Sequence, residues 1–221
     1  MSARLPVSPT PQRSPRQDGE TTRATLLDVA GRLFAEHGYL GTSSKDICLR
    51  AGVNMAAVNY HFGSRDGLYA AVLVEAHRQV ISQEELRALV ASDQPAKDRV
   101  RGLMAHLVAQ MGQDETSWGF KVVLREVMAP SPLASTLVDQ AIVPKAGIVA
   151  GLIADCMGLP HDHPKVQRGL MMTVVPCIVL LLAPPGLREK ALPALQPGSP
   201  DLADHMATFA LAGLDALADA P

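Results

Sequence analysis

Apolar side chains recur at helical spacing along most of the chain. The first such stripe joins Leu26, Ala30 and Phe34, between a possible cap at Thr21 or Thr22 and a stop at Gly38. Later periodic segments, separated by Gly and Pro, predict helices over residues 44–51, 54–62, 65–85, 97–111, 115–128, 135–157, 165–183 and 201–218. No alternating strand pattern of useful length appears. We predict an all-α fold.

Two of the short predicted helices have the spacing of a helix-turn-helix. Cys48, Gly52 and Val58 lie at relative positions 0, +4 and +10. The small side chain permits close packing of the helices, the glycine makes the turn, and the branched residue locks the second helix onto the first. A plain αα-hairpin without a DNA-binding role satisfies the same spacing.

The second helix of this pair has an unusual outer face. Its pattern buries Val58 and Phe62 and leaves outward Met55, Ala56, Asn59 and Tyr60. A solvated helix would carry Lys and Glu there. Small and amide side chains instead suit the major groove, where Ala can contact a thymine methyl group and Asn can bond the N6/N7 edge of adenine. We predict that this face reads bases.

Polar residues around the pair predict contacts with phosphate oxygens, which fix register but not sequence. These residues are Thr42, Ser43, Lys45, Tyr60 and His61. Arg65 follows at the start of the next helix, where free N–H groups and the positive end of the helix dipole favour anions. Up to Arg65 the chain carries eight basic and five acidic side chains, against 12 and 17 in the remainder. A mildly basic head on an acidic body suits this division of roles.

The run from Thr22 to Tyr69 resembles the amino-terminal DNA-binding domain of TetR-type transcriptional regulators. The matching pieces are LFAEHGYLGTSSKDI (33–47), AGVNMAAVNYHFGSRDGLY (51–69) and the amphipathic helix before them. REVMAPSP (125–132) and the later region 159–182 are similar to the carboxy-terminal domain of CecR-type regulators. Cys48 stands where the family usually has alanine, and we expect it to serve packing.

The resemblance implies a three-helix, helix-turn-helix domain followed by a larger helical domain for ligand binding and dimerisation. On this sequence we expect a disordered, Pro-rich arm over residues 1–20, the DNA-binding domain over 21–68, and the effector-binding and dimerisation domain over 69–221. The family further implies a homodimer in which the last two long helices of each chain pair, around residues 174–182 and 202–217.

The middle helices would then enclose a small-molecule effector. The candidate lining residues are His106, Met111, Trp118, Phe120 and Arg125. Methionine and aromatic side chains suit a flat or apolar ligand, with the histidine or arginine as a polar handle. Ordinary core packing accounts for each of these residues taken singly.

Several other classes of protein are disfavoured. Three distant cysteines without a C-x-x-C motif argue against a disulfide scaffold or zinc ribbon. His161 and His163 lie in a Pro-bracketed loop with no third ligand nearby, so we expect no metal. The apolar run Gly169–Ala183 is too short to span a membrane, and the polar, Pro-rich amino terminus does not have the apolar stretch expected of a signal peptide. We expect a cytoplasmic protein without membrane association.

No cofactor or catalytic motif is found. The sequence therefore predicts a DNA-binding transcriptional regulator, not an enzyme. We expect a ligand-responsive repressor that acts as a homodimer on a pseudo-palindromic operator. Two alternatives remain open, in both of which the helix-turn-helix is vestigial: a helical small-molecule-binding protein, and an all-α enzyme that uses the central cavity.

Overall fold

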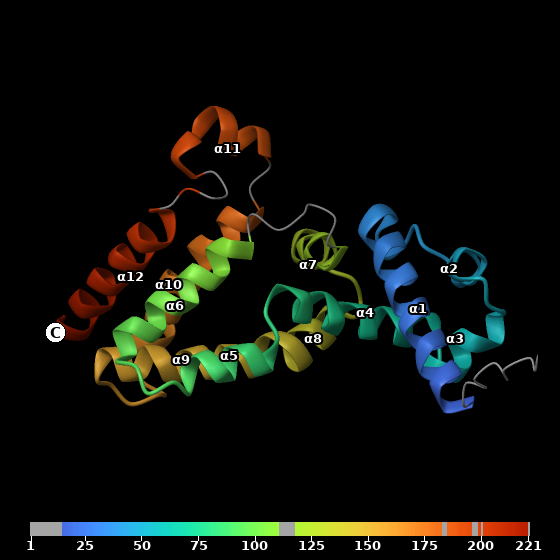
Figure 1. Ribbon diagram of the computed structural model, residues 1–221, viewed down its shortest axis with the longest axis horizontal. Coiled ribbons are helices and arrows are strands. Elements are labelled where there is room, and N and C mark those ends of the chain that lie inside the picture. Colours follow the sequence, from blue (N-terminus) through green and yellow to red (C-terminus); the bar gives the residue numbers. More distant parts are fainter. Residues whose placement is uncertain (1–14, 111–117, 183–184, 196–198, 200, 221) are drawn as a thin grey trace, which may run out of the picture. The chain divides into compact units, whose positions relative to one another are not determined.

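The computed structural model of this chain describes residues 15–110, 118–182, 185–195, 199 and 201–220. Every regular element within these ranges is a helix, which confirms the all-α prediction (Figure 1). The chain divides into two compact units, residues 1–71 and 72–221. The boundary falls inside one helix, α4 (Arg65–Val80), whose first turns belong to the first unit and whose last turns belong to the second.

The first unit contains α1 (Pro15–His37), α2 (Ser44–Ala51), α3 (Met55–Phe62) and the start of α4. Its core is apolar and tightly packed around Phe34, whose ring centroid lies 4.5 Å from that of Tyr69. The fully buried members of this core are Leu26, Ala30, Ile47, Val58 and Leu68. Cys48 is also buried and burial raises the pKa of its thiol, which suits the packing role expected of it.

The first helix begins earlier than the sequence suggested. Residues 15–20 were expected to belong to a disordered arm, but α1 already begins at Pro15. Proline is well tolerated in the first turn of a helix, where its missing N–H has no partner to lose, and Asp18 complements the positive end of the helix dipole. The remainder of the expected arm, residues 1–14, lies outside the described residues.

The second unit is a bundle in which five helices supply the core. These are α5 (Gln83–Val90), α6 (Ala96–Gln110), α9 (Val143–Met157), α10 (Pro164–Leu182) and α12 (Leu202–Asp219). In Figure 1, α6, α10 and α12 lie together, with α9 and α5 packed across them. The shorter elements are α7 (Trp118–Met128), α8 (Ala134–Leu137), the π-helical turn η1 (Val138–Ile142), α11 (Pro185–Ala191) and the 3₁₀ turn η2 (Pro193–Leu195).

The predicted helix over residues 65–85 is two helices. α4 ends at Val80, and Ser82 begins α5 with a capping box: its hydroxyl accepts from the Glu85 N–H, and its own N–H donates to the Glu85 carboxylate. This reciprocal pair satisfies two helix-end donors and allows the chain to change direction. The predicted segment 115–128 begins at Trp118 within the described residues, and α11 was not predicted.

A close backbone approach fixes the second half of α4 against α7. A Cβ atom added at Gly119 would lie 2.8 Å from the carbonyl oxygen of Ala76 on α4. Such a contact is too short for any side chain, so glycine lets the two helices meet. This packing holds the last turns of α4 within the second unit.

The stretch that meets the length and apolarity of a membrane span is not the one considered from the sequence. Among the described residues it is Ala134–Met157, which comprises α8, η1 and α9. A helix in a protein core passes the same test, and Leu152, Ile153 and Ala154 of α9 are buried in the core of the second unit. Residues 169–182 belong to α10 instead.

Candidate DNA interface and effector cavity

The predicted recognition helix is α3, and its cap and core contact are both formed. The Asn54 side chain accepts a hydrogen bond from the Ala57 N–H at 3.1 Å and so begins the helix. Val58 is buried, whereas the four residues expected to face outward are exposed: Met55, Ala56, Asn59 and Tyr60. Tyr60 is 83% exposed, a high value for a tyrosine. The helix therefore presents a continuous outer face of small, amide and aromatic side chains.

The turn before α3 depends on a glycine in the left-handed conformation. Gly52 has φ 67°, and its N–H and that of Val53 bond the last carbonyls of α2. Ser43 caps the other end of α2, where its hydroxyl accepts from the Asp46 N–H at 3.2 Å. A residue with a β-carbon would be strained at this φ. Glycine therefore allows the turn that sets the angle between the two helices.

Thr42 is not placed for the phosphate contact expected of its side chain. The residue is 3% exposed, and its hydroxyl is directed at the carbonyl oxygens of Leu33 and Gly38, at 3.2 and 3.0 Å. Leu33 lies in the last turns of α1, and Gly38 directly follows its last residue. Thr42 therefore holds the end of α1 from inside the unit, and its contact with phosphate stays a prediction.

Arg65 is also turned inward. Its Nε donates to the carbonyl oxygen of Thr42 at 2.8 Å, and an Nη group donates to the carbonyl oxygen of Tyr39. The guanidinium stacks over the Tyr39 ring, 4.3 Å from its centroid, and pairs with Asp66 at 3.3 Å. The Tyr39 hydroxyl donates to the same carboxylate at 2.8 Å. Arg65 thus joins α4 to the loop after α1, which differs from the phosphate contact predicted for it.

The remaining predicted contacts lie on or near the surface. Ser43 and Lys45 are exposed, and His61 is half-buried beside the Tyr60 ring. The sequence interpretation missed three exposed neighbours on the same unit: Leu40, Leu49 and Arg50. Leu40 and Leu49 are 92% and 77% exposed. Their positions could have been found from the helical stripe of α2, which buries Ile47 and leaves Leu49 and Arg50 outside.

The expected effector residues do not share one environment. Trp118 is buried, His106 and Phe120 are half-buried, Arg125 is exposed, and Met111 lies outside the described residues. Glu126, next to Arg125, is buried and accepts hydrogen bonds from the N–H and hydroxyl of Ser131, which holds the turn after α7. The effector site at these positions stays a prediction.

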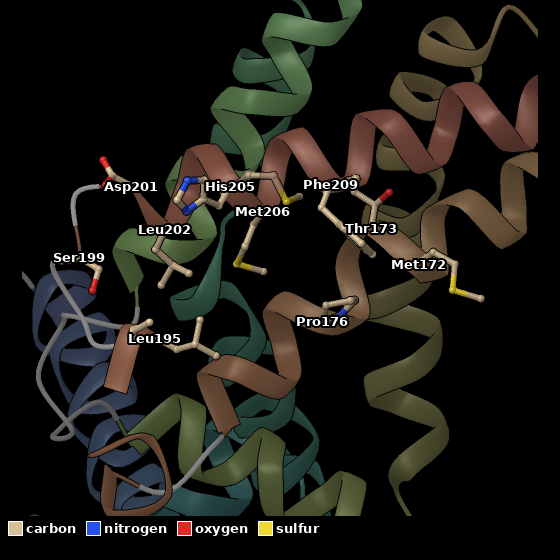
Figure 2. A pocket seen from close by; sticks show the side chains of 13 residues that line it. Met172, Thr173, Pro176, Leu195, Ser199, Asp201, Leu202, His205, Met206 and Phe209 are labelled. Atoms are coloured by element: carbon tan, nitrogen blue, oxygen red, sulfur yellow. The ribbon is translucent and has the colours of Figure 1, made fainter. Parts of the chain in front are cut away.

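A cavity of about 650 Å³ lies elsewhere in the second unit, between α6, α10, η2 and α12 (Figure 2). None of the four described candidate residues lines it, although Met104 of the same helix as His106 does. Apolar side chains dominate its lining: Met104, Met172, Pro176, Leu195, Leu202, Met206 and Phe209. Sequence reasoning assigned α10 and α12 to the dimer surface and gave no signal for a cavity between them.

The faces of α10 and α12 that do not pack on the core are also apolar. On α10 the exposed large side chains recur every three or four residues: Met171, Met172, Val175, Ile178 and Val179. On α12 Phe209 is 82% exposed, and Ala212, Gly213 and Ala216 beside it are exposed and small. Contiguous apolar surface of this kind marks an interaction site.

Both units match known families of proteins. Residues 26–72 match the family of bacterial regulatory proteins of the tetR type, and residues 96–217, more than half of the chain, match the C-terminal domain of the HTH-type transcriptional dual regulator CecR. The CecR protein of Shigella flexneri is 29% identical over 157 residues, which cover 67% of this chain and 70% of that one. The regulator BetI of Burkholderia mallei is 33% identical over 86 residues, 39% of this chain and 44% of BetI.

Solved structures share the fold at low sequence identity. A proposed transcriptional regulator of Pseudomonas aeruginosa PAO1 superposes with a TM-score of 0.69 at 18% identity, covering 89% of this chain and 91% of that one. The hemolysin II regulator HlyIIR gives 0.59 at 16% identity, covering 86% and 97%. AmtR of Mycobacterium smegmatis gives 0.57 at 21% identity, covering 91% and 90%.

A helix-turn-helix unit joined through one helix to a larger helical unit defines a DNA-binding transcriptional regulator. The chain belongs to the TetR family of bacterial regulatory proteins and carries a C-terminal domain of the CecR type. Regulators of this family bind DNA operators and typically form homodimers.

Proposed function

We propose that this protein is a ligand-responsive repressor that binds a pseudo-palindromic operator as a homodimer. The observation that carries the proposal is the outer face of α3, which is exposed yet holds no Lys or Glu. A face of this composition suits close approach to the edges of bases. We further propose that the protein is cytoplasmic, has no enzymatic activity and requires no cofactor.

The proposed DNA contacts follow from exposure. Met55, Ala56 and Asn59 read bases, and Asn59 pairs with adenine through its amide. Phosphate contacts are made by exposed or half-exposed polar residues: Ser43, Lys45, Tyr60 and His61. Thr42 and Arg65 act from inside the unit, where they hold α1, α2 and α4 in register.

We propose that the apolar faces of α10 and α12 are the homodimer interface. The periodic exposed side chains on α10 give a stripe that a second helix can cover, and the small residues of α12 permit close crossing. Two-fold symmetry then places two copies of α3 in successive major grooves, which requires a palindromic site.

Effector binding in the second unit would shift the equilibrium between two arrangements of the DNA-binding units. α4 begins in one unit and ends in the other, so a change at its last turns reaches the first unit through a continuous helix. An allosteric coupling of this kind is typically worth about 1–3 kcal/mol.

Fluorescence anisotropy with the duplex from upstream of the protein's own gene tests the proposal. We expect competitor-resistant binding of two chains per site at two salt concentrations, and weak, steeply salt-dependent binding to scrambled DNA. If the natural duplex behaves like the scrambled one, sites are selected from random sequence. Failure to enrich any site contradicts the proposed function.

A substitution on α3 tests the base-reading assignment in the same assay. Asn59→Ala should weaken the binding free energy by about 1–3 kcal/mol through one base pair of the selected site. The protein should then tolerate other bases at that position. Tyr60→Phe is the matched comparison, because it should weaken binding to all sequences alike. An Asn59→Ala protein with an unchanged sequence preference would contradict the role given to this helix.

A further inference from the structure

The cavity between α10 and α12 combines an apolar body with one polar end. Figure 2 shows Asp201 and Ser199 at one end of the lining residues, and Met172 and Phe209 at the other. Between them the wall contains Met206 and Leu202 of α12 and Pro176 of α10. A volume of about 650 Å³ is in the range of small-molecule sites. Thioether side chains adapt their shape to apolar ligands.

Thr173 of α10 contributes a hydroxyl to the wall of the cavity. Thr173 is 3% exposed and lines the cavity, yet its hydroxyl makes no hydrogen bond within the part of the chain that the structure describes. Figure 2 shows Thr173 near Met172 and Phe209, away from Asp201. The hydroxyl is therefore outside the polar end of the cavity.

The polar end of the cavity has a single formal charge. Asp201 is the lining residue with a carboxylate, and His205 lies one helical turn after it on α12. Asp201 makes no capping hydrogen bond to α12, and among the described residues no hydrogen bond to its carboxylate or to the His205 ring is formed. Asp204 adds further negative charge in the same turn without lining the cavity. A negative end of this kind favours cations and disfavours carboxylates.

From these observations we propose that the cavity binds an apolar amine, with its ammonium at Asp201 and its hydrocarbon body among Met104, Met206 and Leu202. This inference rests on the proposed function, because the amine would be the effector of the regulator. The cavity also reaches Met172 and Phe209, which belong to the proposed dimer face. An amine bound there would lie next to the second copy of the chain and alter its packing.

Three ten-carbon compounds that differ only in the head group test the ligand class. The full-length protein is loaded with the neutral fluorophore N-phenyl-1-naphthylamine, which is then displaced by decylamine, 1-decanol or decanoate. We expect decylamine, protonated at pH 7, to displace the fluorophore at an at least tenfold lower concentration than decanoate, with decanol between them. Equal displacement by decylamine and decanoate, or no uptake of the fluorophore, would overturn the proposal.

A pair of matched variants tests whether the carboxylate of Asp201 binds the ammonium. Asp201→Asn should remove the advantage of decylamine over decanol, and Asp204→Asn, three residues away, should keep it. Both substitutions keep the size of the side chain and remove one negative charge from the first turn of α12, so they affect the helix alike. Thr173→Val keeps the shape of the wall away from Asp201 and should leave the advantage of decylamine over decanol intact. If both aspartate variants lost the advantage of decylamine equally, the preference would arise from the overall negative charge at this end of α12. That result would contradict the assignment of the ammonium to Asp201.

The same preparations separate this inference from the proposed function. Operator binding is measured by anisotropy with and without decylamine. A protein that binds its selected DNA site but shows no amine preference contradicts the ligand class alone. A protein that prefers decylamine but enriches no DNA site contradicts the regulator alone. We expect both activities, and a fall of at least fivefold in operator affinity when decylamine is saturating.

Discussion

The ammonium of Lys145 lies 2.8 Å from Nδ1 of His77 and joins α9 to the last turns of α4. It also donates to the carbonyl oxygens of His77 and Ile81, at 2.9 and 2.5 Å. All three donors of the ammonium are thus used on the carboxyl end of α4, where unpaired carbonyls and the negative end of the dipole favour a cation. Lys145 is buried, and burial lowers its pKa to about 8.

Replacement of Lys145 by methionine tests this attachment. Methionine fills a similar volume but leaves two carbonyl oxygens and a ring nitrogen without a donor. Removal of a buried charge offsets part of that loss, so we expect a net destabilisation of about 1–3 kcal/mol. Urea unfolding measures the change, and hydrogen exchange of amides 77–82 should accelerate more than that of α12.

Lys97→Met provides the matched control in the same unit. Lys97 pairs with Asp215 at 2.7 Å on the surface of α6 and α12 and does not contact α4. Exposed pairs contribute little to stability, so this variant should unfold close to the wild type. If both lysine variants lose the same stability, the ammonium does not hold α4 in the way described.

Acid should destabilise the protein through His77. Burial, followed by the positive charge of Lys145, lowers the pKa of His77 to about 4 from the ordinary 6.5. Between these values the unfolded chain binds a proton that the folded protein does not, so the free energy of unfolding falls as pH drops from 6.5 to 4. The full shift in the pKa of His77 corresponds to about 3 kcal/mol in the free energy of unfolding. Urea unfolding at several pH values measures this slope.

His77→Asn separates this histidine from the other groups that titrate in acid. The asparagine oxygen can still accept from Lys145 but does not titrate, so the pH slope between 4 and 6.5 should become shallower. His37→Asn, at the exposed end of α1, should leave the slope unchanged. An unaltered slope in His77→Asn would show that the acid sensitivity arises elsewhere.

The helix-turn-helix could be predicted in detail because its information is local. The spacing of Cys48, Gly52 and Val58 determines the turn and the helix contact, and the stripe of α3 determines which residues are exposed. The break after Val80 also has a local signal in the sequence, because Ser82 and Glu85 form a capping box three residues apart. The apolar pattern continues across the break, and for that reason a single helix was predicted over residues 65–85.

The inward direction of Thr42 and Arg65 could not be read from the sequence. Both are polar residues at helix ends, which suits phosphate contact, and only the fold brings the Tyr39 carbonyl and ring within reach of the guanidinium. The cavity was missed for a similar reason. Its wall combines Met104, Thr173 and Met206 from three helices, and an apolar helix face looks the same whether it covers a core, a partner or a cavity.

Substitution of Arg65 by lysine should damage the DNA-binding unit without removing a phosphate contact. A lysine keeps the charge but cannot donate to two carbonyls and stack on Tyr39 at once. We expect a loss of about 1–3 kcal/mol in the unfolding of the first unit. The slope of log affinity for DNA against log salt, measured where the variant is fully folded, should stay the same.

Lys45→Gln should show the opposite behaviour. Lys45 is exposed on α2, so its loss should leave stability unchanged and reduce the magnitude of the salt slope by about one. A shallower slope for Arg65→Lys, with normal stability, would restore the phosphate contact that the sequence suggested for Arg65.

Phe209 offers the sharpest test of the dimer face. It is 82% exposed on α12, and its side chain has few neighbours to lose within its own chain. Phe209→Asp should therefore fold normally, because an exposed carboxylate costs the monomer little. In a dimer the same carboxylate would be buried among apolar side chains without a partner, which is strongly unfavourable. Sedimentation velocity should show a monomer, and operator binding at two chains per site should fall at least a hundredfold.

Met128→Asp controls for a charge placed on another apolar surface position. Met128 is 75% exposed at the end of α7, in the same unit but outside α10 and α12. This variant should remain a dimer and bind the operator normally. If Phe209→Asp stays dimeric while Met128→Asp dissociates, the interface lies on α7 and not on the stripe of α10. The two substitutions introduce the same charge at comparable exposure, so the difference between them reports position alone.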